Sequence, residues 1–406
     1  MALNNSRSRH FLNVLGPGIV VMLADTDAGS VITAAQSGAQ WGYKLLLLQI
    51  FLIPILFLAQ ELTVRLGLVT GKGHGELIRE TFGFPAALLS VSTMAVACMG
   101  ALLTEFSGMA GVGALFGVPA WLTMLIAASG LVIMVWTGSY RSVERVAMFI
   151  GAFEFIFLLV AWKLHPSMHA MVESVTTLSL PHADFEYLIA ANIGAVVMPW
   201  MVFYQQSAVI DKGLGKNDLP AARWDTMMGA IVTQIIMSCV LIAEAATGRH
   251  AVLNTVQQIA DSIIPALGQT SGTLLFALGM TGAAMVASIV VSLTAAWGIG
   301  EIFGFKRSLE HHPREAPWFY GIFTVSVIVA AIVVASRINL VELSVAVEVM
   351  NALLLPIVLG FLYLLASRSL PEPYRLKGGY ARFVAFTLAS TSLIGAYSAL
   401  SGLLGG

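Results

Sequence analysis

Long apolar runs separated by short polar segments make up almost the whole chain. A helix that crosses the hydrocarbon core of a bilayer, about 30 Å thick, needs roughly 20 apolar residues. A window of that length finds eleven candidates, and the alternation typical of barrel strands is missing. The candidates cover residues 13–38, 43–69, 84–113, 119–138, 144–164, 186–210, 222–247, 272–304, 318–336, 341–367 and 382–402. The pattern therefore predicts an all-α polytopic membrane protein with about eleven transmembrane helices.

The composition supports this class and excludes several others. Hydrophobic residues make up 58% of the chain, charged residues 11%, and the formal net charge is −1. A soluble domain carries about a quarter charged residues, so this chain is expected in a lipid bilayer. The near-zero net charge gives no electrostatic basis for nucleic acid as a partner. Cys98 and Cys239 both lie in apolar runs, which excludes a disulfide framework and a thiolate metal site.

The basic residues orient the predicted helices. If the N-terminus is cytoplasmic, most of the 21 Lys and Arg residues fall on that side. They are Arg7, Arg9, Arg65, Lys72, Arg79, Arg141, Arg145, Lys212, Lys216, Arg223, Lys306, Arg307, Arg314, Arg368, Arg375, Lys377 and Arg382. The exceptions are Lys44, Lys163, Arg249 and Arg337. Because cytoplasmic loops carry an excess of Lys and Arg, we expect a cytoplasmic N-terminus and an external C-terminus in the inner (plasma) membrane.

The chain is expected to form a single transmembrane domain over residues 1–406. The longest connections, 165–185 and 305–317, are too short to fold alone. The basic segment 1–10 leads into an apolar run that is too long for a signal peptide and lacks a small-residue cleavage site. We therefore expect no removable signal peptide.

Two predicted spans are interrupted by residues that are costly in a membrane. The first contains Asp25 and Asp27, and the sixth contains Pro199. A carboxylate in the hydrocarbon is by default a functional feature, and a proline frees backbone carbonyls beneath it. Interruptions in corresponding helices of two halves indicate a transporter site between inverted repeats. The halves would cover roughly residues 11–165 and 184–368, followed by an extra helix at 382–402.

Each interruption also has a purely structural interpretation. A lone buried acid is often a hydrogen-bonding group, and a lone proline is often only a kink. Together, at matching positions, they favour a cation site made of carboxylates and freed carbonyls. Glu105 and Glu154, on other spans, are expected to be internal hydrogen-bonding or water-lining groups. Glu105 is in addition a candidate for a role in the transport pathway.

Several segments carry a resemblance to the natural resistance-associated macrophage protein (NRAMP) family. The first span and its end read GPG at 16–18, DAGS at 27–30 and QSGAQWGY at 36–43. The segments RLGLVTGK at 65–72, EF at 105–106, LFGVP at 115–119, AVVMP at 195–199 and LP at 355–356 also resemble the family. The resemblance covers nearly all of the chain. It implies a leucine-transporter-like fold, a 5+5 inverted repeat with broken helices 1 and 6, and metal uptake into the cytoplasm by alternating access.

The resemblance also implies a set of metal ligands. The family's first-span Asp and Asn, which bind the metal, match Asp27 and Ser30, and its sixth-span Met matches Met198. The backbone carbonyls that it uses match Ala24 and Ala195. A tenth-span Gln of the family falls on Glu348, and Asp25 is a further candidate if the segment around it is unwound.

Departures from the family pattern point to a different ion. The sixth-span His is replaced by Trp200, the third-span Asp of the proton route falls on Leu102, and residues 316–336 contain no Lys or Arg. The proton machinery of the family is therefore expected to be missing. Ser30 shortens one ligand and Glu348 adds a charge, which favours partly hydrated Mg²⁺. This pattern resembles the NRAMP-related magnesium transporters.

Several alternatives stay open at this point. Retention of Asp27 and Met198 suits an ordinary proton-coupled Mn²⁺/Fe²⁺ transporter, since a thioether favours softer metals. A carrier of organic solutes is disfavoured by the charge of Asp27, and a channel is not separated from a carrier by sequence. The chain contains no nucleotide, protease or nucleophile motif, so no enzyme and no resident cofactor are expected. The expected partners are the transported Mg²⁺ or Mn²⁺ and the lipid bilayer, with no obligate protein partner.

Overall fold

A computed structural model describes residues 14, 16–176, 183–248, 251–336 and 340–404, and every regular element within these ranges is helical. Ten helical segments are long and apolar enough to cross a membrane. The pair α2 (Pro17–Asp25) and α3 (Ala28–Trp41), bent by 47°, gives an eleventh span. The predicted number of spans is confirmed.

The spans follow the predicted order along the chain. They are α4 (Leu46–Thr70), α6 (Phe84–Leu115), α7 (Ala120–Thr137), α8–η1–α9 (Tyr140–Gly151, Ala152–Phe155, Ile156–Lys163), α11–α12 (Ala183–Val196, Pro199–Asp211), α13 (Leu219–Ala246), α15 (Gln269–Phe303), α16 (Pro317–Ala335), α17 (Leu340–Arg368) and α18 (Gly378–Leu404). The connections also contain α5 (His74–Phe82), α10 (Met168–Thr176), η2 (Lys216–Asp218) and α14 (Val256–Leu267), which the hydrophobic pattern does not predict because they are short.

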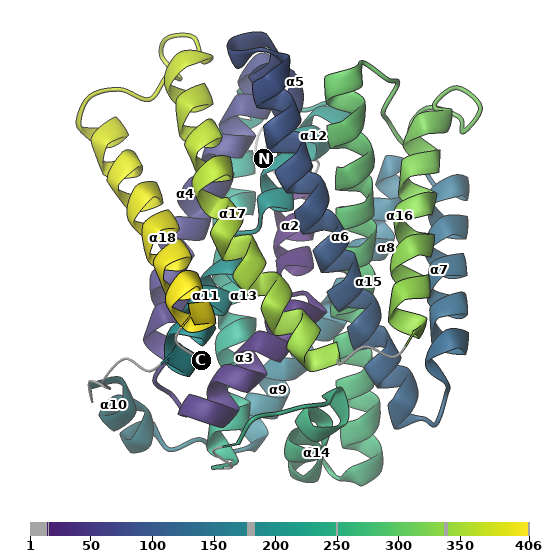
Figure 1. The fold of residues 1–406 in the computed structure, drawn as a ribbon, viewed down its shortest axis with the longest axis vertical. Helices are drawn as coiled ribbons and strands as arrows, with labels where there is room; N and C mark the ends of the chain where they lie inside the picture. Colours follow the sequence, from purple (N-terminus) through teal and green to yellow (C-terminus); the bar gives the residue numbers. More distant parts are fainter. Residues whose placement is uncertain (1–13, 15, 177–182, 249–250, 337–339, 405–406) are drawn as a thin grey trace, which may run out of the picture.

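The connections alternate between the two ends of the bundle. Helix α5 and the α17–α18 connection lie at one end, and α10 and α14 lie at the other (Figure 1). We call the first the basic end, because its connections 71–73, 212–218, 304–316 and 369–377 carry most of the described Lys and Arg residues of the loops. Arg7, Arg9, Arg249 and Arg337 lie outside the described residues, as does the segment 1–10. Which side of the membrane the basic end faces stays a prediction.

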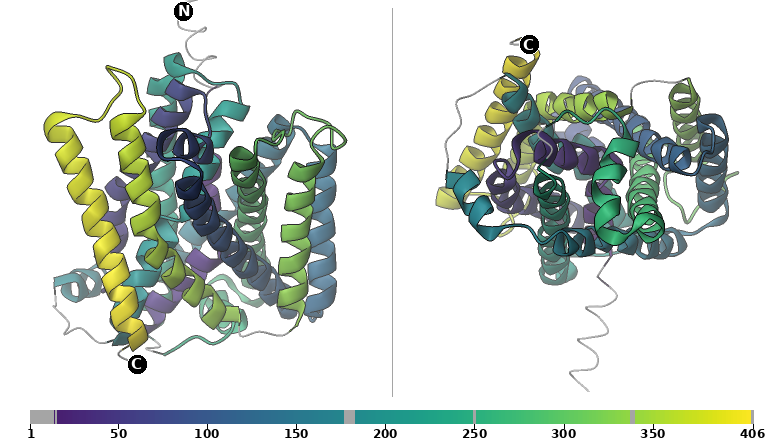
Figure 2. Two further views of the ribbon diagram at one scale, coloured as in Figure 1. Left: turned by 45° about the horizontal axis from the view of Figure 1, so that its top comes forward. Right: turned by 90° about the horizontal axis from the view of Figure 1, so that it is seen from below.

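The two interrupted spans occupy the centre of the bundle. In the α11–α12 span 89% of the most apolar window is buried, against 28% in α7. Helix α3 packs against α13, α17 and α11, and α2 packs against α13 and α15. Viewed along the bundle, α2 and α3 lie inside the surrounding helices, whereas α18 and the pair α7 and α16 lie at the periphery (Figure 2). Protein therefore shields the irregular backbone from lipid, as its polar groups require.

Gly194 permits the closest approach of α11 to α17. A Cβ atom at Gly194 would overlap the carbonyl oxygen of Glu348 and lie 2.9 Å from the backbone nitrogen of Ala352. Because both obstacles are backbone, we expect Gly194→Ala to destabilise the protein by about 1–3 kcal/mol and to lower its apparent melting temperature in detergent. Gly360→Ala, on α17 with open space around it, is the matched control and should melt like the wild type. Equal melting of both variants would contradict this close packing.

Candidate metal-binding site

The break in the first span frees one carbonyl and fixes one carboxylate. Asp27 is the N-cap of α3, and its Oδ1 accepts the backbone N–H of Ser30 at 2.6 Å, as short polar side chains do at helix starts. The N–H of Ala28, which in a continuous helix would bond the carbonyl of Ala24, donates instead to Oε2 of Glu105 at 3.1 Å. The carbonyl of Ala24 is thereby released from the helical pattern.

The break in the sixth span frees a second carbonyl for a different reason. Helix α12 begins at Pro199, whose ring nitrogen has no hydrogen to donate to the carbonyl of Ala195. That carbonyl accepts the hydroxyl of Ser30 at 3.1 Å instead. The two breaks therefore meet, and a hydrogen bond between Ser30 and Ala195 joins them.

Helices α6 and α17 bring two further acids to this point. Glu348 is fully buried, and its Oε2 accepts the amide of Asn351 at 3.0 Å. Its other oxygen lies against Gly29, where an added Cβ would overlap it and would also lie 3.2 Å from Oγ1 of Thr104. Glu105 is fully buried and lies close enough to Asp27 and Glu348 for their charges to interact. Gly29 is thus needed to let Glu348 reach the break.

Several oxygens at the break are buried without an N–H or alcohol donor among the residues that the structure describes. They are Oδ2 of Asp27, both carboxyl oxygens of Asp25, Oε1 of Glu348 and Oδ1 of Asn351. Each can only accept when the acids are ionised, and leaving a buried acceptor unpaired costs about 1–3 kcal/mol or more for a charged group. Such a concentration of unpaired acceptors is unusual in a folded protein and is what a bound cation would satisfy.

The donor set is mixed rather than a ready-made cage. Among the residues that the structure describes, no group of three or more His, Cys, Asp and Glu side chains is placed to hold a metal ion. Asp27 and Glu348 would act together with carbonyl oxygens and water. Oxygen ligands with retained waters suit Mg²⁺, and carboxylate, carbonyl and water also suit Mn²⁺.

Asp25 and Met198 are placed differently from the other predicted ligands. Helix α2 extends through Asp25, which is buried near Asp27 and Glu348 and is also close to Glu154 of η1. Met198 is the N-cap of α12 and fully buried, and its sulfur accepts the indole N–H of Trp200 at 3.1 Å. The thioether of Met198 is therefore hydrogen-bonded to Trp200.

Hydrogen bonds and ion pairs join the helices at the basic end. Asp225 accepts the N–H of Gly18 at 2.8 Å at the start of α2, and Lys212 pairs with Glu144 at 2.8 Å. Glu301, at the end of α15, accepts the N–H of Gly75 and the hydroxyl of Ser207, both at 2.7 Å. Further ion pairs at this end join Arg223 and Arg65 to Glu61, and Arg307 to Glu76.

The opposite end of the bundle contains a cavity with a partly polar lining. A cavity of about 290 Å³ lies there between α3, α11, α17 and the 252–254 segment. Its polar lining includes Gln36, Gln40, Asp184, Asn254 and Glu342, with no Lys or Arg among the lining residues. Gln36 belongs to α3, the helix that begins at the break, and none of the candidate ligands lines the cavity itself.

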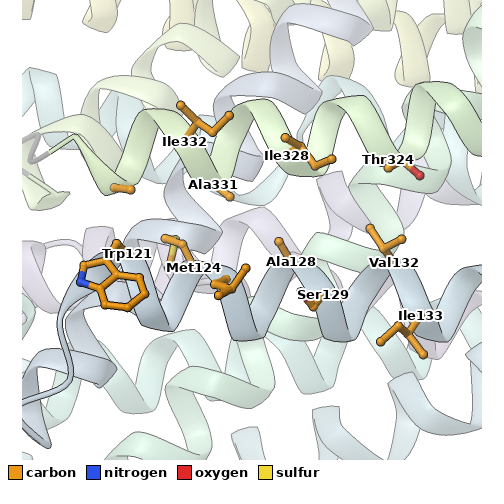
Figure 3. A pocket seen from close by; sticks show the side chains of 12 residues that line it. Trp121, Met124, Ala128, Ser129, Val132, Ile133, Thr324, Ile328, Ala331 and Ile332 are labelled. Carbon is orange, nitrogen blue, oxygen red and sulfur yellow. The ribbon is translucent and has the colours of Figure 1, made fainter.

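A separate groove lies on the periphery. It has a volume of about 500 Å³ and runs between α7 and α16 (Figure 3). Its lining is almost entirely apolar, with Trp121, Met124, Ile328 and Ile332 among the side chains that face it. The groove carries no charged residue and is not part of the candidate site.

Eleven helical spans whose first and sixth members break and meet define a polytopic membrane protein with a leucine-transporter-like fold. The family described as natural resistance-associated macrophage protein-like matches residues 18–401. The chain belongs to this family, and the resemblance found in its sequence motifs is confirmed.

Relatives and solved structures agree with this assignment. The divalent metal cation transporter MntH of Aeromonas hydrophila subsp. hydrophila is 28% identical over 302 residues, 70% of this chain and 72% of that protein. The MntH protein of Klebsiella pneumoniae (strain 342) is 26% identical over 299 residues, 70% of each chain. A crystal structure of the Eremococcus coleocola manganese transporter matches with a TM-score of 0.81 at 18% identity, over 97% of this chain and 88% of that chain. Mhp1, a nucleobase-cation-symport-1 family transporter, matches with a TM-score of 0.63 at 15% identity, over 96% and 91%. The predicted fold class is confirmed.

Two contacts at the break go beyond the residues predicted as ligands. Glu105, expected to be an internal hydrogen-bonding group, accepts the N–H of Ala28, the first residue of α3. Trp200, which stands where the family has a histidine, donates its indole N–H to the sulfur of Met198. The sequence gives no signal for either contact. The separation of two residues between Met198 and Trp200 does not predict their hydrogen bond, because the backbone is irregular at Pro199 between them.

Proposed function

We propose that the chain carries divalent metal cations across the membrane by alternating access, with Mg²⁺ and Mn²⁺ as substrates. Asp27 would be the principal ligand. Ser30, Glu348, Asp25 and the carbonyls of Ala24 and Ala195 complete the set of proposed oxygen ligands, and Met198 is proposed as a weak, soft ligand beside them. Transport, rather than catalysis, is the activity named for the relatives.

One observation supports a cation as the substrate above all others. Acceptor oxygens of Asp27, Glu348 and Asn351 are fully buried where two helices are broken, and no N–H or alcohol group of the described residues donates to them. The carboxylates would repel an anionic solute, whereas a divalent cation replaces the missing donors and also balances the charge.

The preference for Mg²⁺ rests on charge and size. Glu348 adds a carboxylate where the family resemblance expects a neutral Gln, and Ser30 is shorter than the expected Asn. A hard cation that keeps part of its water shell favours a wide site with carboxylates. The proposed function is therefore magnesium-capable uptake.

The proposed direction of transport rests on the charges at the two ends of the bundle, and the proposed lack of proton coupling rests on residues missing from the proton route. By the excess of Lys and Arg, the basic end would face the cytoplasm, with the N-terminus inside, the C-terminus outside and the protein in the plasma membrane. The cavity lined by Asp184 and Glu342 would then admit cations from outside. Leu102 stands where the family's proton route has an Asp, and the ninth span has none of the arginines of that route. Uptake would therefore proceed without proton coupling.

A second candidate is a proton-coupled Mn²⁺/Fe²⁺ transporter. Met198 at the start of α12 is the observation that favours it, because a thioether prefers transition metals over Mg²⁺. The name of the Eremococcus coleocola relative, a manganese transporter, agrees with this alternative.

Transport in liposomes separates the two candidates. The purified protein is reconstituted with a luminal Mg²⁺ or Mn²⁺ indicator in one preparation and a luminal pH dye in another. We expect both ions to enter without acidification of the lumen, because no proton would move with the metal. Glu372→Gln, which alters an exposed residue paired with Lys377 in the α17–α18 connection, serves as the matched control and should transport like the wild type.

Entry of Mn²⁺ with acidification and exclusion of Mg²⁺ would refute uncoupled magnesium uptake. It would establish the proton-coupled alternative in its place. Absence of metal entry for any ion would refute both.

A further inference from the structure

The thioether of Met198 is already engaged within the protein. Its sulfur accepts the indole N–H of Trp200 at 3.1 Å, and both side chains are fully buried. An indole N–H is a donor with no acceptor capacity of its own, and when buried it usually finds a partner. In this core the partner is a sulfur atom.

This hydrogen bond opposes metal coordination in two ways. It directs the sulfur toward the indole, and it draws electron density from the lone pairs that a soft metal would use. For the sulfur to bind a metal at full strength, the bond to Trp200 must break and leave a buried N–H unpaired, which is unfavourable. No water can replace the sulfur as acceptor without entering a fully buried position.

We infer that Trp200 determines specificity by holding the sulfur of Met198, so that the oxygen ligands at the helix breaks select hard cations. The inference rests on the proposed function and explains why a soft ligand persists in a site proposed for Mg²⁺. Trp200 is a positioning residue, because it acts through Met198. Among the described residues, its indole makes no hydrogen bond to a proposed oxygen ligand.

Replacing Trp200 by Phe removes the N–H and keeps an aromatic ring. We expect Trp200→Phe to raise the ratio of Cd²⁺ to Mg²⁺ uptake, and of Mn²⁺ to Mg²⁺ uptake, by about fivefold, the value of one ordinary hydrogen bond. Initial rates of each ion are measured alone and in competition in liposomes. Uptake of Mg²⁺ by the variant shows that it is folded.

Met198→Leu supplies the matched test, because it removes the sulfur at nearly constant volume. With Trp200 present, we expect Met198→Leu to leave the Cd²⁺ to Mg²⁺ ratio within about twofold of the wild type. In the Trp200→Phe background, Met198→Leu should abolish the gain in that ratio, which makes the effect non-additive, as expected for residues in contact.

Two results would overturn the inference. One is an unchanged Cd²⁺ to Mg²⁺ ratio in Trp200→Phe, and the other is a tenfold loss of Cd²⁺ uptake in Met198→Leu with Trp200 intact. The second result remains decisive even if Trp200→Phe does not fold. If Asp27→Asn loses uptake while these ratios do not move, only the inference fails. If Asp27→Asn keeps wild-type uptake, the proposed function fails.

Discussion

Replacing Asp27 by Asn or by Ala abolishes uptake of both Mg²⁺ and Mn²⁺, with initial rates reduced by about 100-fold or more. Asp27 is fully buried, and among the described residues no N–H or alcohol group donates to its Oδ2. Removing one partner of a buried charge pair typically costs about 3–5 kcal/mol, and each 1.4 kcal/mol is a factor of ten in affinity. The loss should therefore be nearly complete for any divalent substrate.

The two substitutions separate ligation from helix capping. Oδ1 of Asp27 also caps α3 through the N–H of Ser30. Asn caps helices about as well as Asp, whereas Ala loses about 1 kcal/mol of helix stability. If capping alone mattered, Asp27→Asn would retain uptake and only Asp27→Ala would lose it.

Uptake in liposomes, together with thermal melting in detergent, measures both effects. We expect Asp27→Asn to melt like the wild type and to lose uptake, and Asp27→Ala to lose both uptake and some stability. Substantial uptake by Asp27→Asn would show that the buried charge is dispensable and would remove the central ligand from the proposed site.

The spans were predictable because their signal is averaged over many residues. An apolar run of about 20 residues identifies a membrane helix whatever its neighbours are. The short helices α5, α10 and α14 lack such a run. They form in the connections, where contacts with the ends of the long spans stabilise them. α14, for example, begins at Val256 after the N-cap residue Thr255, whose hydroxyl oxygen accepts the N–H of Gln258.

The positions of the two breaks were also predictable, but their chemistry was not. Asp27 and Pro199 are visible in the sequence because each is costly in an apolar helix. The contacts of Ala28 with Glu105 and of Ser30 with Ala195 join segments far apart in the chain. Such pairings depend on which faces of the helices meet, and no local pattern specifies that.

Glu348 shows how far a spacing argument reaches. Its distance from Pro356 places it opposite the first break only if α17 continues without a bulge, and α17 is a single helix over Leu340–Arg368. The requirement for Gly29 beside Glu348 became visible only from the packing of α3 against α17. A glycine at the start of a helix does not indicate which atom occupies the space that its side chain would otherwise fill.

Replacing Glu348 by Gln reduces Mg²⁺ uptake by about tenfold or more and raises the preference for Mn²⁺. The Gln side chain has the same length, and its carbonyl oxygen can accept the amide of Asn351 as Oε2 does now. The substitution therefore removes a charge and leaves the packing intact. Mg²⁺ sheds water reluctantly and gains more from an anionic ligand than a transition metal does, so its uptake should suffer more.

The measurement is the uptake of Mg²⁺ and Mn²⁺, each alone and in competition, with Glu244→Gln as the control. Glu244 is also a fully buried acid within a span, but it bonds Ser262 near the end of α13. Its substitution should leave the ratio of the two ions unchanged. Equal losses for Mg²⁺ and Mn²⁺ in Glu348→Gln would make Glu348 a structural group, whereas an unchanged rate for both would remove it from the ligand set. A selective loss of Mg²⁺ would identify the charge of Glu348 as the feature that adapts this family member to a hard cation, because no other atom of the site has changed.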